Sequence, residues 1–261
     1  MTSPDFRRQL RFALWMFGTV VFGVFAAMVV SGFTAAREAA RETVCRGRMC
    51  KLQLALRNYH EVYGSFPPAY IADADGKPMH SWRVLILPYL DANHIYVQYR
   101  FDEPWDSPHN FELARKYGNE HFRCASSTAP PGSRLTNYVA IVGPGTPFPG
   151  AGVTTLDDLH DGKENTILLA EIAESNIHWM EPRDLRIDEM SFQLNDRRKP
   201  GLSSPHDFGP GVVFADAITT YRVGHGVKPK TLRALTTIAG REPVTRKSLI
   251  HPDGPPIHLN E

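Results

Sequence analysis

An uncharged apolar run of 21 residues, Phe12–Gly32, places the strongest constraint on how this 261-residue chain can fold. As a helix rising about 1.5 Å per residue it spans about 30 Å, which matches the hydrocarbon core of a bilayer. Lipid offers the backbone no hydrogen-bond partners, so a helix is the expected structure of the segment. We therefore predict a membrane-spanning helix over residues 12–34, preceded by a short tail of residues 1–11.

The apolar run continues without a helix breaker into an amphipathic sequence. Packable side chains recur there at alternating spacings of four and three residues, which is the repeat of one helix face. This face consists of Cys45, Met49, Leu52, Leu56, Tyr59 and Tyr63. We predict one helix from about residue 10 to residue 63, ended by Gly64. The stripe from Met49 to Tyr63 is expected to pack against a following domain, and a self-assembly seam is the alternative.

The charges around the apolar run indicate its orientation. Arg7, Arg8 and Arg11 precede it, and the positive-inside rule then places residues 1–11 in the cytoplasm. Basic residues such as Arg37 also follow the run and weaken this bias. A cleaved signal peptide is the alternative, but its apolar core is usually only about 7–15 residues long. We expect a retained anchor with the rest of the chain outside the cytoplasm.

The overall composition argues against one class of partner. Charged residues make up 22% of the chain and the net charge is +1, so the strongly basic balance of a nucleic-acid-binding protein is absent. No nucleic-acid partner is therefore expected.

The remaining sequence predicts an α+β domain over residues 35–241 and a proline-rich tail over residues 242–261. A loop is expected at Ser65–Pro78. Short helices are expected at His80–Leu90, 108–117 and 229–239, and strands at Asn137–Val142, Thr166–Ile172, Gly211–Ala215 and Thr219–Val223. The last two strands form a hairpin around Asp216-Ala217. Helices early and strands late indicate an antiparallel sheet packed on the long helix.

The sequence holds no motif for nucleophilic catalysis, nucleotide binding or a structural zinc site. Ser203-Ser204 near His206 is interpreted as a coincidence of composition. Some isolated groups could still converge on a metal ion in the fold. They are His160, Asp161, His178, His206, Asp207, His225, Glu171 and Asp216, and the Asp157–Asp161 turn is a further weak cation candidate. A structural role is the expectation for each, and no cofactor is predicted.

The tryptophans leave two interpretations open. Trp82, Trp105 and Trp179 could line a carbohydrate or peptide groove, but core packing is the expectation because large aromatic side chains dominate burial. A pocket that brought His178, Trp179 and Asp188 together would favour a binding function.

Several blocks of sequence stand in an order that resembles a known bacterial family. They are AREAAR at Ala36–Arg41, LQLALRNYHEVYGSFPPAY, SWRVLILPYLD, FDEPWDSPHN, FRC, TNYVAIVGPGT, DGKENTILLAE, WMEPRDL and VVFAD. The family is known as domain of unknown function 1559, is abundant in planctomycetes, and resembles type IV pilins and pseudopilins. The resemblance covers roughly residues 35–223. It implies a hydrophobic N-terminal helix, an amphipathic extension and a C-terminal β-sheet head.

Three sequence features bear on that resemblance: a Gly-Phe-Thr tripeptide, the predicted hairpin turn and the cysteines. Family members begin with a prepilin-type signal before the apolar run, but the only Gly-Phe-Thr here is Gly32-Phe33-Thr34, after the run. Ala217 stands where the family hairpin commonly has glycine. Cys45 and Cys124 match the family's two usual cysteines, which makes them the disulfide candidate, with buried free thiols as the alternative; Cys50 is additional.

Together these features predict a membrane-anchored, pilin-like protein of the cell envelope with a non-catalytic structural or interaction role. The expected partners are the membrane and either further copies of the chain or other pilin-like subunits, and no small-molecule partner is predicted. The alternatives are an extracytoplasmic module that binds a solute or polysaccharide, and an enzyme.

Overall fold

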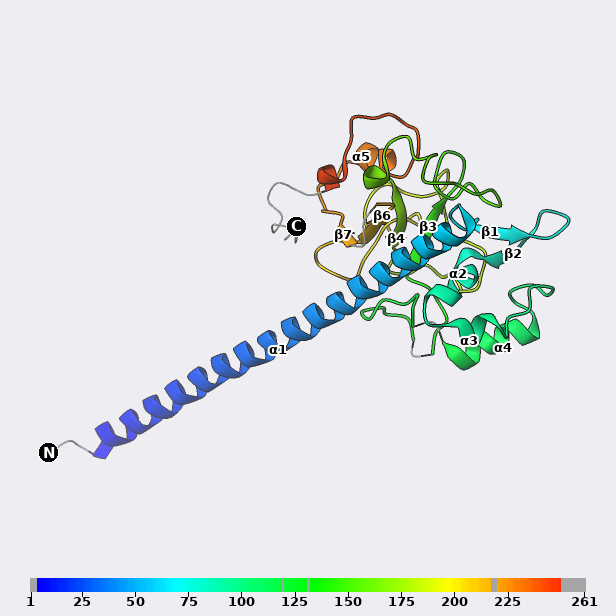
Figure 1. Ribbon diagram of the computed structural model, residues 1–261. Helices are drawn as coiled ribbons and strands as arrows, with labels where there is room; N and C mark the ends of the chain where they lie inside the picture. The colour runs from blue at the N-terminus through cyan, green and yellow to red at the C-terminus, as the bar shows by residue number, and fades with distance from the viewer. Residues whose placement is uncertain (1–3, 119, 131, 217–219, 250–261) are drawn as a thin grey trace. The chain divides into compact units, whose positions relative to one another are not determined.

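The computed structural model describes residues 4–118, 120–130, 132–216 and 220–249. The chain separates into two units, Met1–Glu42 and Thr43–Glu261, so the boundary lies several residues beyond the predicted end of the membrane segment at residue 34. Helix α1, Pro4–Tyr63, contributes to both units and begins earlier than predicted (Figure 1). Proline suits the first position of a helix because the amide hydrogen that it lacks has no partner there.

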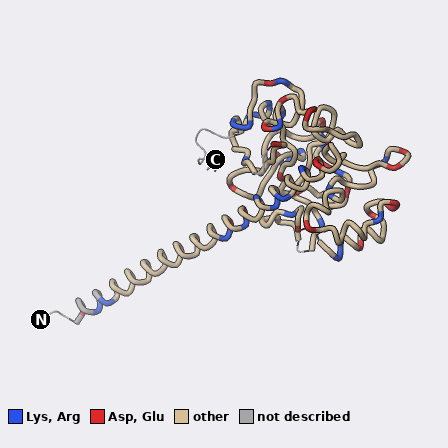
Figure 2. Tube along the Cα trace, in the orientation of Figure 1, with Lys and Arg blue, Asp and Glu red and all other residues tan. Residues whose placement is uncertain are grey.

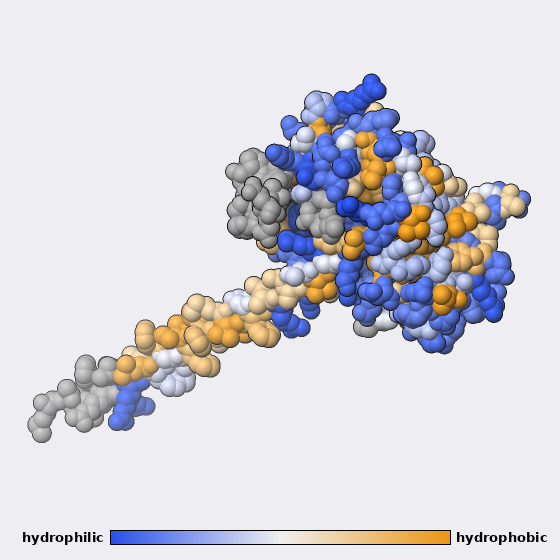
Figure 3. All heavy atoms as spheres, viewed as in Figure 1, coloured by the Kyte–Doolittle hydropathy of each residue, from blue (hydrophilic) through white to orange (hydrophobic). Residues whose placement is uncertain are grey.

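The described part of the first unit is helix alone, and most of its described side chains are exposed. The large apolar side chains from Phe12 to Phe33 range from 45% exposed at Met16 to 72% at Phe22. Figure 2 shows a long part of α1 without a charged residue, and Figure 3 shows the same part as an apolar surface. This part of α1 is long and apolar enough to cross a membrane, and its most apolar stretch is not buried by the described chain.

In the second unit, most of the predicted stripe on α1 faces the core. Cys45, Met49, Leu52 and Leu56 are at most 1% exposed. Tyr59 is half-buried against the core, whereas Tyr63 is 60% exposed, so the prediction that Tyr63 belongs to the packing stripe is wrong. The helix turns away from the core at its end. Gly64 then stops it as predicted, with φ of 75° and its N–H donating to His60 O at 2.8 Å.

A five-stranded sheet forms the centre of the second unit, in the order β5-β3-β4-β6-β7. The strands are β3 Tyr138–Val142, β4 Ile167–Glu171, β5 Leu185–Arg186, β6 Gly211–Phe214 and β7 Thr220–Arg222. The four predicted strands pair antiparallel as expected. The sheet is nevertheless mixed, because β5 pairs parallel with β3. Two residues are too few to give a strand pattern in sequence, which explains why β5 was missed.

Both faces of this sheet are covered. Tyr138 and Ala140 belong to the core cluster that contains the buried face of α1. Their neighbours Val139 and Ile141 belong to a second cluster, with Leu232 of α5, Pro229–Ala234. Successive side chains of a strand point to opposite faces, so a sheet covered on both sides needs apolar residues throughout. The continuous apolar runs of these strands are the consequence.

A glycine at the start of β6 lets α1 approach the sheet closely. A Cβ atom at Gly211 would lie 2.7 Å from Met49 Sδ, closer than two such atoms can pack. The backbone N–H of Gly211 also donates to Glu171 Oε2 at 3.0 Å, which connects β6 to a buried carboxylate.

The region after α1 differs most from the sequence predictions. The predicted loop contains β1, Tyr70–Ala72, which pairs antiparallel with β2, Pro78–Ser81. The predicted helix His80–Leu90 is instead the end of β2 followed by α2, Trp82–Leu85, and a 3₁₀ turn η1, Leu87–Tyr89. Ser81 explains the late start, because its side chain caps α2 by accepting from Arg83 N. Pro88 lies in the 3₁₀ turn, where no α-helical bond is required of it.

The remaining helices are short. Helix α4, Pro108–Tyr117, begins after Ser107 and ends at Gly118 as predicted. Helix α5 ends five residues before the predicted end at residue 239. The other elements are α3 Asn93–Tyr96, η2 Lys163–Asn165 and η3 Arg246–Leu249.

The start of the predicted tail is packed. Leu249 is fully buried, its carbonyl accepts from Gly224 N at 3.0 Å, and Arg246 pairs with Asp216 at 2.7 Å. The prediction of a loosely ordered tail is therefore wrong for residues 246–249. Residues 250–261 and Ala217 in the predicted hairpin turn lie outside the described residues.

A buried ion pair ties α2 to the sheet. Arg83 Nη2 lies 2.5 Å from Asp184 Oδ1, and their side chains are 0% and 2% exposed. Asp184 also accepts from Ala140 N at 2.8 Å, and Arg83 donates to Tyr138 O at 3.0 Å. Burial raises the pKa of Asp184, and the guanidinium of Arg83 opposes that rise. Each charge thus has the partners that a buried ion requires.

The buried face of α1 is expected to contribute much more stability than its exposed face. Leu52→Ala should lower the free energy of unfolding by about 3 kcal/mol, because it leaves a cavity between α1 and the sheet. Leu54→Ala is the matched control, since Leu54 is 39% exposed on the same helix. Urea unfolding of the detergent-solubilised full chain, followed by tryptophan fluorescence, measures both. Equal losses in the two variants would contradict this packing.

Candidate functional site

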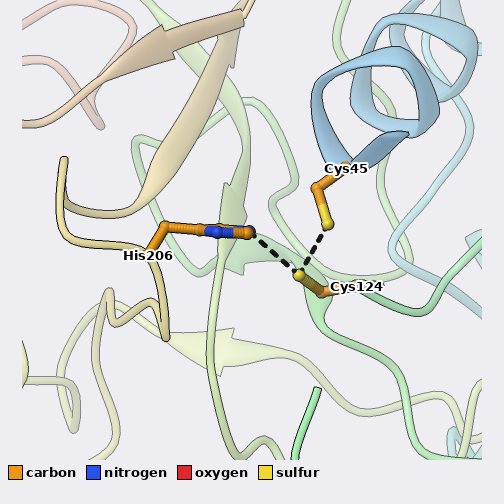
Figure 4. Close-up of side chains that lie close together, drawn as sticks. All are labelled: Cys45, Cys124 and His206. Atoms are coloured by element: carbon orange, nitrogen blue, oxygen red, sulfur yellow. Dashed lines mark hydrogen bonds between the residues drawn. The ribbon is translucent and has the colours of Figure 1, made fainter. Parts of the chain in front are cut away.

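Three side chains able to bind a metal or exchange electrons meet inside the second unit (Figure 4). Cys45 comes from α1, Cys124 from the connection between α4 and β3, and His206 from the connection before β6. Cys124 Sγ lies 2.7 Å from Cys45 Sγ and 3.3 Å from His206 Nε2. The exposed fractions are 1%, 1% and 4% respectively. We call these three residues the thiol–imidazole cluster.

Backbone and side-chain hydrogen bonds fix both cysteines. The N–H of Ala125 donates to Cys45 Sγ at 3.0 Å, and the N–H of Cys124 donates to Asn137 Oδ1 at 2.9 Å. The Asn137 amide in turn donates to Ile172 O at 3.0 Å, just after β4. The loop that carries Cys124 is thereby held against both α1 and the end of β4.

The buried carboxylate of Glu171 lies next to the cluster. Glu171 Oε2 accepts from Ser204 Oγ at 2.9 Å, Gly211 N at 3.0 Å and Arg222 Nη1 at 2.9 Å. Glu171 Oε1 lies 3.8 Å from His206 Nε2 and accepts no hydrogen bond within the part of the chain that the structure describes. Arg222 balances the carboxylate charge, which a residue only 1% exposed requires.

As free thiols, the two cysteines differ in acidity. The hydrogen bond from Cys124 lowers the pKa of Cys45, assisted by His206 and by the N–H groups of Ala125 and Ser126, while burial opposes this shift. The same thiol–thiol hydrogen bond, followed by burial, raises the pKa of Cys124. The pair would therefore lose its first proton at Cys45, with Cys124 as the hydrogen-bond donor.

A pair of buried thiols beside an imidazole can do two things chemically. The thiols can oxidise to a disulfide, or they can act with the imidazole as soft ligands for a metal ion. Disulfide formation also needs a two-electron oxidant, which takes up the two electrons as both protons leave the sulfurs, and ligation needs a metal ion from solution; the cluster supplies the bonding atoms in both cases. Ser204, by contrast, donates its hydroxyl to Glu171 and accepts from His206 N at 3.1 Å, so it holds the loop in place.

Most of the other histidines and acids named from the sequence do not converge. Asp161 accepts from the backbone of Gly240 and Arg241, both at 2.7 Å, and so supports the segment after α5. Asp158 accepts from Thr155 N at 2.7 Å within its own turn. Two acids of the weak cation candidate in this turn, Asp158 and Asp161, therefore accept hydrogen bonds from the protein itself, as expected for structural roles.

The remaining candidates also have separate roles. His225 Nε2 bonds to Asp207 O at 2.9 Å on the surface, and Asp216 pairs with Arg246. His178 stacks with Phe111, with ring centroids 5.3 Å apart. Burial lowers the pKa of His178 to about 4, so its ring is neutral at physiological pH.

Of the three tryptophans named from the sequence, two pack into the core as expected from their size, whereas Trp105 is half-buried against it. Trp82 and Trp179 are at most 1% exposed, and Trp179 stacks on Phe122 with ring centroids 5.3 Å apart. Asp188 is exposed and pairs with Arg186 at 2.7 Å. His178 and Trp179 do stack on each other, but Asp188 shares no described cavity with them.

Sequence reasoning found the cysteines but not the complete cluster. It named His206 and Glu171 among groups that could converge, without connecting them to Cys45 and Cys124. His206 lies 82 positions after Cys124 in the chain, and no spacing signal links them, because both lie in connections between helices and strands. The pairing of β4 with β6 places Glu171 beside the loop of His206, and the packing of α1 on the sheet adds Cys45.

The fold and the cluster together define an α+β protein whose apolar N-terminal helix continues into a mixed-sheet unit with a buried thiol pair. A family model described as a protein of unknown function (DUF1559) matches residues 34–193, which is more than half of the chain. The chain belongs to this family, as its sequence blocks predict. Cys45 and Cys124 lie inside the matched part, and His206 lies beyond it. No curated protein and no solved structure matches the chain.

The predicted disulfide between Cys45 and Cys124 stays a prediction, which chemical analysis can check. We expect the full chain isolated without reductant to be lighter by two hydrogen atoms than the reduced chain, with the bond mapped to these cysteines. Reduction should lower the free energy of unfolding by up to about 4 kcal/mol, because the bond closes a long loop. Cys50→Ser should change neither result. Alkylation of both Cys45 and Cys124 without prior reduction would contradict the pairing.

Proposed function

We propose that this protein is anchored in a membrane by α1 and presents its second unit outside the cytoplasm, in a non-catalytic structural or interaction role at the cell envelope. The observation that carries this proposal is the uncovered apolar stretch of α1. Exposing the large side chains from Phe12 to Phe33 to water would be costly, whereas lipid accommodates them. The stretch is helical throughout, so its backbone bonds are satisfied as lipid requires.

The orientation rests on charge. Arg8 and Arg11 stand before the apolar stretch, and the next basic residue is Arg37. The positive-inside rule gives the short N-terminal segment to the cytoplasm. An extracytoplasmic second unit also suits a thiol pair that is predicted to be oxidised, because disulfides persist in such compartments.

A pilin-like assembly is the finer part of the proposal. It is supported by family membership together with the family's resemblance to pilins, and by the continuation of the apolar helix into the second unit. The exposed face of α1 beyond residue 43 offers only scattered apolar side chains, such as Val44 at 46% and Val62 at 64% exposed. Contacts between copies would therefore run mainly through the apolar stretch, where dispersion contacts between helices replace contacts with lipid.

The non-catalytic role is supported by the hydrogen bonds and the burial of the side chains that could react. Glu171, Asp161 and Ser204 each accept or donate hydrogen bonds that hold the fold together. The two thiols that could act as nucleophiles are buried at 1% exposure. This arrangement suits a rigid unit that presents a surface.

The topology is tested by reporter fusions in a bacterial host. Alkaline phosphatase fused to the C-terminus should be active, and green fluorescent protein at the same place should be dark, because the first folds only outside the cytoplasm and the second only inside. N-terminal sequencing should find the chain uncut before residue 37. An inactive phosphatase with a fluorescent counterpart would overturn the orientation, and a cut between residues 12 and 37 would replace the anchor with a signal peptide.

Assembly is tested by photo-crosslinking in native membranes. A crosslinking residue at Phe22, which is 72% exposed, should give a regular ladder of multimers or adducts with other pilin-like chains. The same residue at Arg41 should also report neighbours, whereas at buried Leu56 it should give no intermolecular adduct. Monomer alone from both Phe22 and Arg41 would contradict assembly and leave a tethered unit.

A further inference from the structure

The thiol–imidazole cluster has the composition of a metal site. Its two sulfur atoms and one imidazole nitrogen come from three distant segments, and all lie within 4.8 Å of one another. We propose that the chain in its dithiol form binds one Zn²⁺ ion through Cys45 Sγ, Cys124 Sγ and His206 Nε2. This binding is independent of the membrane role proposed above.

The chemistry of the three side chains selects this class of ion. Thiolate and imidazole are the preferred ligands of Zn²⁺, with bonds of about 2.3 Å to sulfur and about 2.0 Å to nitrogen. Around a tetrahedral ion two thiolates lie roughly 3.8 Å apart. The sulfurs, now 2.7 Å apart, would therefore separate by about 1 Å on binding, while Cys124 Sγ and His206 Nε2 are already near the required spacing at 3.3 Å.

A fourth ligand lies beside the cluster. Glu171 Oε1 is 3.8 Å from His206 Nε2 and accepts no hydrogen bond from the described residues, although Glu171 Oε2 accepts three. A carboxylate that is 1% exposed and keeps one oxygen without a hydrogen bond is unusual, because such groups are normally satisfied. We assign this oxygen to the fourth position, which would close the site in the manner of structural zinc.

The charges around the site also favour a divalent ion. Two thiolates and the Glu171 carboxylate carry three negative charges, and the ion with Arg222 supplies three positive charges. The sum is zero, which limits the cost of burying the ion. A shallow depression of about 310 Å³ lined by Cys124, Arg123 and Ala125 offers a route to the cluster from solvent.

Metal binding and the predicted disulfide exclude each other. Reduction of the disulfide by a dithiol breaks the S–S bond, delivers two electrons and two protons to the sulfurs, and leaves the reductant as its own disulfide. Zn²⁺ then displaces both thiol protons to solvent. The cluster thus holds a disulfide bond in its oxidised form and a metal ion in its reduced form.

The experiment uses the full chain in detergent, which is first reduced with a phosphine. Gel filtration under argon then removes both the phosphine and free metal ions. Titration with Zn²⁺, followed by elemental analysis of the desalted protein, should give about one ion per chain. Titration with Co²⁺ should give the intense absorption of tetrahedral thiolate coordination. The chain oxidised beforehand should bind neither ion.

Matched variants assign the ligands. Cys124→Ser and His206→Gln should each weaken binding at least ten-fold, whereas Cys50→Ser and His225→Gln should leave it unchanged. Circular dichroism checks that each variant is folded. If a ligand variant does not fold, X-ray absorption at the zinc edge of the wild-type protein decides the matter, since it should report two sulfur neighbours. Reduced wild-type chain that retains no metal, or binding that requires Cys50 in place of Cys124, would overturn the proposal. The reporter fusions are unaffected by either result.

Discussion

The second unit depends on the burial of one face of α1 against the sheet. Leu52 and Leu56 lie under that contact, and Gly211 allows the helix to come close because it has no side chain in the way. A helix this long cannot hide its apolar residues by itself, so the face that meets the sheet decides where the protein core begins. Before that point the same helix contains the uncharged stretch Phe12–Gly32, and a bilayer is the environment that suits its apolar side chains.

Two buried carboxylates connect strands of the sheet to one another and to α2. Asp184 meets the guanidinium of Arg83 and links α2 to β3, while Glu171 meets Arg222 and links β4 to β6 and β7. In each case a charge taken out of water is balanced by an opposite charge and by backbone donors. Such pairs add little net stability compared with apolar packing, but they accept few alternative arrangements and so favour one register of the strands.

The thiol–imidazole cluster lies where these features meet. Cys45 comes from the buried face of α1, and His206 from the loop that Glu171 holds through Ser204. The cluster therefore lies within the contact between α1 and the rest of the second unit. A structural role for the pair is consistent with its burial, and it does not require a substrate to reach the sulfurs.

The sequence by itself determined the membrane-length helix, its inward face as far as Tyr59, four of the five strands of the central sheet and the family. Each of these comes from a repeat or a composition within one segment, which local physical chemistry fixes. The tertiary structure alone decided that Tyr63 turns outward, that β5 adds a parallel edge, and that His206 and Glu171 approach the cysteines. These outcomes depend on which distant segments pack together, and a pattern along the chain does not record such contacts.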